Sequence, residues 1–190
     1  MFRNTYLKAV LAIALLFFLF PPVKAGATSI QGLAIRINDG AVLVSARLVI
    51  SGPALKEIKS GMEKKIVFYV DLYRHWSSWP DEFIMGRQIE RDLDCDSVKG
   101  EYIMVFREKG SSGAIRYESC NELISNALIL KDIKLSHLEG LTYGRYYVRV
   151  TAQSRLMSLP PLLGQMFFFI RSKEFSVQAD SATVYLGGGH

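Results

Sequence analysis

The sequence predicts a mainly β protein, an antiparallel β-sandwich with two short helices that follows an N-terminal signal helix. Three observations predict this class. Apolar and polar residues alternate with a period of two through much of the chain, turn-forming residues separate the alternating runs, and no strand–helix–strand rhythm appears. We expect about eight to ten short strands. An immunoglobulin-like strand order is one form that such a sandwich takes.

The N-terminal segment predicts export. Arg3 and Lys8 form a basic start, an unbroken apolar run follows at residues 9–20, and Pro21 ends that run shortly before the small residue Ala25. A basic segment, an apolar segment and a small-residue cleavage site are the three parts of a secretory signal peptide. The apolar run is shorter than the about 20 residues that span a bilayer.

We therefore predict a signal peptide at residues 1–25, one sandwich domain at residues 26–186 and a flexible glycine-rich tail at residues 187–190. Cleavage is expected after Ala25 or Ala27, which leaves a periplasmic protein without stable membrane insertion. The alternative that stays open is a membrane-anchored protein that keeps its N-terminal helix.

The net charge of the exported chain is small. The full sequence has 23 Lys+Arg and 18 Asp+Glu, and three of the basic residues but no acidic residue lie in the first 25, so 20 basic and 18 acidic residues remain. A nucleic-acid-binding protein concentrates its basic residues on one face or stripe. The densest basic stretch, residues 56–65, is interrupted by Glu57 and Glu63. We expect no nucleic-acid partner, and the high pI overstates any attraction to a membrane.

The first elements of the domain are a hairpin and a short helix. Two alternating runs within residues 30–50 flank Asn-Asp-Gly at residues 38–40, which tolerates the positive φ of a tight hairpin turn. A helix is expected next, because Pro53 suits a first helical turn and Gly61 suits the position after a helix end.

The run IVFYVDLYRHW at residues 66–76 is apolar on both faces, as is typical of a strand in the centre of its sheet. A second helix is expected after Ser119, because Ser119 and Glu122 have the spacing of a capping box. Further strands are predicted at residues 83–93, 102–106, 114–117, 129–135, 143–151, 166–170 and 175–186, the last of them broken at residues 179–181.

Cys95 and Cys120 are the two cysteines of the chain. A disulfide between them suits an exported protein. It would close a loop of about 26 residues and contribute about 3 kcal/mol in the chain-entropy model. A pair of buried thiols is equally open, because free cysteine is among the most buried residue types.

The sequence contains no motif that predicts catalysis or a metal site. The three histidines, His75, His137 and His190, lack metal-ligand spacing, and the sequence has no nucleotide-binding loop or serine-hydrolase elbow. We expect no enzyme activity, no cofactor and no metal. A hydrolase whose residues meet only in the folded chain is the third functional class that we consider.

The most distinctive stretch is YRHWSSWPDE at residues 73–82. Arg74, His75, Trp76 and Trp79 are the candidate binding residues, because aromatic and arginine side chains stack on sugar rings and anchor protein partners. The alternative is that the tryptophans have a structural role and close the open end of the core. Trp76 is expected to be buried, because its parity places it on the more apolar face of its strand, whereas Trp79 lies beyond the run.

The order of these features resembles that of domain-of-unknown-function family 4390, an uncharacterised family of exported proteobacterial proteins. The pieces that carry the resemblance are the strand VSARLVIS, the short helix before Gly61, the strand VFYVDLYRHW with its continuation WSSWPDE, the helix after Ser119, the strand at residues 143–150 and the segment LPPL. The likeness covers residues 30–180. It departs near the C-terminus, where relatives tend to have a tryptophan and this chain has Phe175 and Tyr185.

The resemblance implies an exported domain without a known activity. Some relatives are encoded beside envelope-sensing kinases, which implies a signalling partner. The leading hypothesis is an exported, non-enzymatic domain that binds another envelope protein. The alternative is a glycan- or peptidoglycan-binding module that uses Arg74, Trp76 and Trp79.

Overall fold

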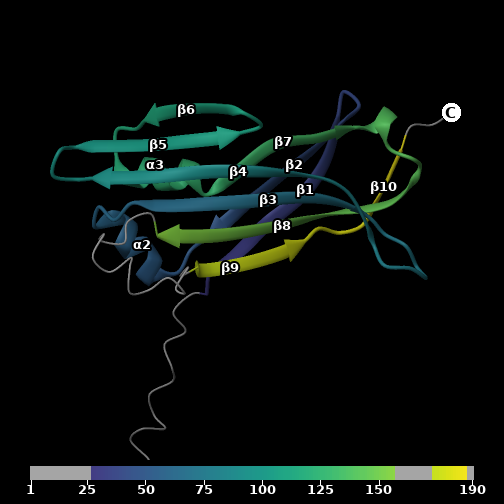
Figure 1. The fold of residues 1–190 in the computed structure, drawn as a ribbon, viewed down its shortest axis with the longest axis horizontal. Coiled ribbons are helices and arrows are strands. Elements are labelled where there is room, and N and C mark those ends of the chain that lie inside the picture. The colour runs from purple at the N-terminus through teal and green to yellow at the C-terminus, as the bar shows by residue number, and fades with distance from the viewer. Residues whose placement is uncertain (1–26, 157–172, 188–190) are drawn as a thin grey trace, which may run out of the picture.

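The computed structural model describes residues 27–156 and 173–187 of the 190-residue chain. These residues form ten β-strands, two α-helices and one short 3-10 helix, arranged as two antiparallel sheets that face each other (Figure 1). The prediction of a mainly β, antiparallel sandwich with two short helices is therefore confirmed. The signal peptide and the strand predicted at residues 166–170 lie outside the described residues.

The smaller sheet has three strands in the order β1-β2-β7. These strands are β1 (Ser29–Asn38), β2 (Ala41–Val49) and β7 (Ile129–His137). The hairpin prediction is confirmed, because β1 and β2 pair antiparallel and Asp39 and Gly40 turn between them with φ of 48° and 69°. Both residues adopt this positive φ at low cost, which explains the Asp-Gly pair at the turn.

The larger sheet has seven strands. They are β3 (Lys64–Arg74), β4 (Glu82–Asp96), β5 (Glu101–Glu108), β6 (Ser111–Arg116), β8 (Gly144–Leu156), β9 (Lys173–Asp180) and β10 (Val184–Leu186). The order is β10-β8-β3-β4-β5-β6, and β9 also pairs with β8. The central position predicted for β3 is confirmed, because β3 pairs with β4 on one side and β8 on the other along its whole length.

Both predicted helices are present. Helix α2 (Gly52–Lys59) has Pro53 in its first turn, and α3 (Cys120–Ala127) begins after Ser119. The Ser119 Oγ accepts a hydrogen bond from the Glu122 backbone N–H at 3.2 Å, and the Glu122 carboxylate accepts one from the Glu118 N–H. The capping box therefore forms, with its carboxylate reaching one residue further back than the usual pattern. A 3-10 turn, η1 (Leu138–Gly140), follows β7.

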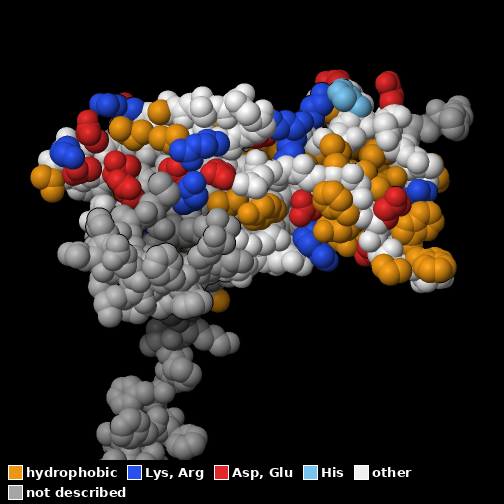
Figure 2. Space-filling view, viewed as in Figure 1, with side chains coloured by type: hydrophobic (Ala, Val, Ile, Leu, Met, Phe, Trp, Pro, Cys, Tyr) orange, Lys and Arg blue, Asp and Glu red, His pale blue; other side chains and the backbone are white. Residues whose placement is uncertain are grey.

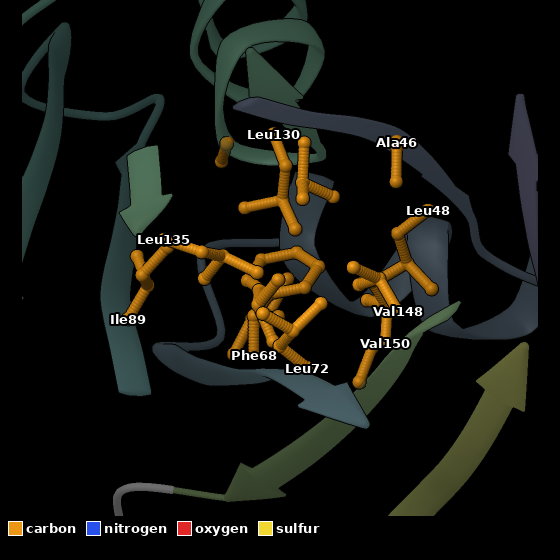
Figure 3. Close-up of a cluster of buried hydrophobic side chains, with 14 of the residues drawn as sticks. Ala46, Leu48, Phe68, Leu72, Ile89, Leu130, Leu135, Val148 and Val150 are labelled. Atoms are coloured by element: carbon orange, nitrogen blue, oxygen red, sulfur yellow. The ribbon is translucent and has the colours of Figure 1, made fainter. Parts of the chain in front are cut away.

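The core lies between the two sheets. Side chains from β2 and β7 on one side meet side chains from β3, β4 and β8 on the other (Figure 3). The side chains labelled there are Ala46, Leu48, Phe68, Leu72, Ile89, Leu130, Leu135, Val148 and Val150, all of them buried. This arrangement explains the strict alternation in β2, since one of its faces fills the core and the other faces outward.

A disulfide and a set of hydrogen bonds hold α3 against β4. Cys95 in β4 and Cys120, the first residue of α3, form a disulfide with their Cα atoms 5.5 Å apart. The Arg91 Nη1 donates to the backbone carbonyls of Asn126, Ala127 and Ile129 at 3.0, 2.6 and 2.7 Å. Its guanidinium also lies 5.4 Å from the centre of the Phe68 ring, and burial lowers the pKa of Arg91 below its usual value. Arg91 thus satisfies carbonyls that the end of a helix leaves without partners.

No helix within the described ranges 27–156 and 173–187 combines the length and the apolar character needed to cross a membrane.

Candidate functional site

Exposed aromatic side chains gather at one end of the sandwich, around the loop that joins β3 to β4. The described residues expose nine large hydrophobic side chains, and five of them belong to this group, which we call the aromatic end. Its members, with their exposed fractions, are Trp76 (39 %), Trp79 (78 %), Phe83 (57 %), Tyr143 (68 %) and Tyr185 (65 %). Figure 2 shows hydrophobic side chains at this end, to the right, opposite the end where α2 lies in Figure 1.

The prediction that Trp76 is buried in the core is wrong. Strand pairing between β3 and β4 stops at Arg74 and Glu82, so the alternation that would turn residue 76 inward does not continue. The Trp76 ring instead lies under the Arg74 guanidinium, whose Cζ is 4.2 Å from the ring centre, and the Trp76 Nε1 donates to the Glu82 carboxylate at 3.3 Å. Trp79 is the more exposed of the two tryptophans, as expected.

Arg74 links the loop to the neighbouring strand. Its Nη2 donates to the backbone carbonyl of Tyr143 at 3.1 Å. Gly144 makes room for this contact, because a Cβ atom there would lie 2.9 Å from the Arg74 Nε. The Tyr143 ring in turn stacks with Tyr185 from β10, with ring centres 6.1 Å apart. Arg74 and Tyr143 therefore connect the Trp76 ring of the loop with the stacked rings of Tyr143 and Tyr185.

The Asp81 carboxylate holds the loop in its conformation. It accepts hydrogen bonds from the Tyr147 hydroxyl at 2.9 Å and from the Trp76 backbone N–H at 3.3 Å, and it contacts the His75 Nδ1 at 2.9 Å. These contacts, that of Tyr147 first, lower the pKa of Asp81 below its ordinary value. Burial, followed by the bond to Asp81, raises the pKa of Tyr147 to about 12. Tyr147 therefore remains a hydrogen-bond donor at neutral pH.

Aromatic and arginine side chains pack together on the outer face of the larger sheet, next to the loop. The Tyr73 and Tyr147 rings stack with centres 5.4 Å apart, and Phe83 meets Tyr73 edge to face at 5.7 Å. The Arg149 guanidinium lies 5.1 Å from the Tyr73 ring centre and makes two hydrogen bonds of 2.8 Å to Asp180. These side chains come from β3, β4, β8 and the end of β9 and pack as cross-strand neighbours.

All four candidate residues of the sequence lie at this end. Arg74, Trp76 and His75 belong to the contact network described above, while Trp79 is the most exposed of the four. Sequence reasoning did not single out Asp81, Tyr143, Tyr147 or Tyr185. The position of Asp81 two residues after Trp79 was the one available indication, and the tyrosines join the group only through strand pairing.

The arrangement is suited to recognition. Arg74 contacts the Trp76 ring and the Tyr143 backbone, and Asp81 bonds to the Trp76 backbone, so a partner finds apolar area whose order is already established. Within the described parts of the chain, no group of three or more His, Cys, Asp or Glu side chains could hold a metal ion. Three surface hollows lie elsewhere, lined in part by Arg36, Pro53 and Ile103 respectively.

Comparison with known proteins gives one match. The model of a family described as a domain of unknown function, DUF4390, matches residues 25–183. This range contains the whole aromatic end except Tyr185. No curated protein and no solved structure matches the chain.

Proposed function

Because the chain belongs to the DUF4390 family, whose description names no activity, we propose its function from the aromatic end. The protein is an exported, non-enzymatic binding domain that docks on another protein of the cell envelope. The single observation that carries this proposal is the connected group of exposed rings at one end of the sandwich.

The composition of the aromatic end supports a protein partner. Tryptophan, tyrosine and arginine are the residues most enriched among those that dominate binding energy at protein interfaces. Trp76, Tyr143 and Tyr185 lie within one chain of contacts that includes Arg74. Contiguous apolar patches on monomeric proteins are often functional, whereas single exposed side chains need no explanation.

Export to the envelope is proposed on the N-terminal sequence. The basic start, the apolar run at residues 9–20 and the small residues after Pro21 support a signal peptide that is removed after Ala25 or Ala27. The periplasm is the compartment that this proposal assigns to the mature chain, and a disulfide such as Cys95–Cys120 suits an oxidising compartment.

Site-specific photocrosslinking in living cells tests the docking proposal. A photoreactive amino acid replaces Tyr143 in one variant and Val98 in the other. Val98 is the matched control, because it is 98 % exposed and lies in the turn between β4 and β5, at the opposite end of the sandwich. We expect a defined crosslinked envelope protein from position 143 and none from position 98. Equal products from both positions, or none from position 143, would overturn the proposal.

A glycan-binding module is the second candidate, favoured by one specific observation. The highly exposed Trp79 lies two residues before Asp81 and three before Glu82 in the sequence. Sugar-binding sites combine an aromatic ring that stacks on the sugar with carboxylates that accept hydrogen bonds from its hydroxyl groups. Tryptophan fluorescence under titration with peptidoglycan fragments distinguishes the two candidates. A saturable change in fluorescence that Trp79→Ala abolishes would favour glycan binding. A spectrum that does not change during the titration would exclude the glycan-binding candidate.

A further inference from the structure

The outer face of the smaller sheet is strongly basic. Four exposed basic side chains, which we call the basic face, come from all three of its strands: Arg36 from β1, Arg47 from β2, and Lys131 and Lys134 from β7. Arg36 and Lys134 share a row, since both lie opposite Leu43. Asp132 is the acidic residue among them and forms an ion pair with Arg36.

A β-bulge brings the two lysines to the same face. Residues three apart in a regular strand point to opposite faces of the sheet. In β7, however, Val44 lies opposite Ile133 and Ala46 lies opposite Leu130, so Lys131 and Asp132 together face the single residue Ser45. This extra residue reverses the alternation, and Lys131 joins Lys134 on the outer face while Leu130 still points into the core.

The bulge is held by specific bonds. Asp132 has a φ of 51°, an uncommon backbone conformation for a residue other than glycine. Its backbone N–H donates to the Ser45 Oγ at 3.1 Å, and the Ser45 hydroxyl donates to its carboxylate at 3.2 Å. Two hydrogen bonds therefore hold the backbone in the form that places Lys131 beside Lys134.

The charges of the two outer faces are arranged differently. On the larger sheet, basic residues pair with acids: Lys65 with Glu90 at 2.9 Å, Arg107 with Asp92 at 2.6 Å and Arg149 with Asp180 at 2.8 Å. On the smaller sheet, Arg47, Lys131 and Lys134 make no salt bridge with any residue in the described ranges. The basic face thus keeps three of its four cations outside any salt bridge within the described part of the chain, although the net charge of the mature chain is small.

We propose that the basic face binds the surface of a lipid bilayer that contains anionic phospholipids. Its charges are spread over an open sheet whose neighbouring strands are about 4.8 Å apart, and they do not converge on one point. The hollow on this face is lined by Arg36 and Asp132, which already neutralise each other. A spread array fits a plane of lipid phosphates, and each Lys or Arg near such a surface strengthens binding by about fivefold.

This surface is separate from the aromatic end and does not depend on the proposed docking function. The smaller sheet lies behind the larger one in Figure 1, while the β3–β4 loop extends beyond one end of both. A protein that rests on a bilayer through its basic face leaves the aromatic end at the side, free to meet a membrane-associated partner.

Vesicle sedimentation tests this proposal on the exported chain as purified from cells. Binding is measured on vesicles with 30 % phosphatidylglycerol in phosphatidylcholine and on pure phosphatidylcholine. If the chain keeps its N-terminal segment, the apolar run at residues 9–20 binds both kinds of vesicle whatever their headgroup charge. The ratio of the two partition coefficients cancels that contribution. The test variant is K131Q/K134Q. The control is K56Q/K59Q, which removes two exposed lysines of the same spacing from α2.

We expect the ratio to fall roughly 10- to 30-fold in K131Q/K134Q and much less in K56Q/K59Q, and to fall with added salt in the unmodified protein. Equal losses in the two variants would overturn the proposal, because net charge alone would then explain the binding. A ratio near one for the unmodified protein would also overturn it. If the protein in that case binds immobilised polyglutamate and K131Q/K134Q does not, the basic face would be assigned to an acidic protein partner instead.

Discussion

At the scale of single residues, Asp81 organises the candidate site. Its carboxylate joins the Tyr147 hydroxyl on β8 to the Trp76 N–H and the His75 ring in the loop. No other carboxylate described for this end bonds to three such groups at once. The conformation of the loop around Trp76 therefore depends on one acidic side chain that remains ionised at neutral pH.

This network predicts a pH-dependent loop. The pKa of Asp81 is lowered in the folded protein, so its contribution to stability is fully present above its unfolded-state value near 3.8 and is lost as the pH falls through the lower folded value. Because both tryptophans lie in this loop, their fluorescence should change in that acidic window and the change should be absent in Asp81→Asn.

Asp96→Asn is the matched control for this titration. Bonds from Lys99 lower the pKa of Asp96 in a similar way, but Asp96 lies at the other end of the sandwich. A fluorescence transition that persists in Asp81→Asn and disappears in Asp96→Asn would contradict this role of Asp81.

Trp76 is expected to contribute little to stability. It is 39 % exposed, and its main interaction is with the Arg74 guanidinium, a contact that contributes about 0.5–1 kcal/mol at exposed sites. Urea unfolding of Trp76→Ala should therefore show a loss of about 1 kcal/mol, and Trp79→Ala a smaller one. A loss of about 3–5 kcal/mol for Trp76→Ala would indicate a core residue instead.

At the scale of elements, sequence patterns identified those parts whose structure depends on near neighbours. The turn at residues 38–40, the cap at Ser119 and the central strand β3 follow from local turn chemistry, hydrogen bonding and alternation. The burial of Trp76 was predicted wrongly, because alternation applies only while strand pairing lasts and pairing ends at Arg74.

The sites that sequence patterns missed are assembled across strands. The stacked pair of Tyr73 and Tyr147 is 74 residues apart in the chain and meets only through the pairing of β3 with β8. Lys131 and Lys134 share a face because of a bulge that no alternation pattern shows. The immunoglobulin-like strand order is not found, because β3, β4, β5 and β6 lie side by side in chain order in the larger sheet.

The junction of α3 with the larger sheet predicts a large effect at Arg91. Arg91→Ala removes a donor from three carbonyls and leaves them poorly hydrated, so we expect the free energy of unfolding to fall by about 2–4 kcal/mol. Arg116→Ala is the control, because Arg116 is well exposed and lies 3.8 Å from its partner Glu101. Urea melts that give the two variants equal, small losses would contradict the bracing role of Arg91.

At the scale of the whole molecule, the chain has two surfaces of different chemistry. The aromatic end offers exposed rings, and the basic face offers positive charges from three strands. Our two proposals assign the aromatic end to a protein partner and the basic face to a membrane surface, and the first of them assumes that the chain is exported. Export is therefore the first requirement of the proposed function.

Intact-mass measurement of the protein from the periplasmic fraction tests export and the disulfide together. We expect a chain that begins at Gly26 or Thr28 and is lighter by two hydrogens than its fully reduced form, because Cys95 and Cys120 are joined. Full-length protein in the membrane fraction would favour the uncleaved anchor, and an unchanged mass after reduction would contradict the disulfide.

The central claim is that the aromatic end is a recognition surface and contributes little to the fold. The most direct test compares the protein with the double variant Trp79→Ala/Tyr185→Ala. Two quantities are measured for each: the free energy of unfolding, and the yield of partner crosslinked from position 143. We predict nearly unchanged stability and a yield lower by at least about tenfold, since residues that dominate an interface contribute about 2 kcal/mol or more each. Unchanged stability with an undiminished yield would contradict the claim.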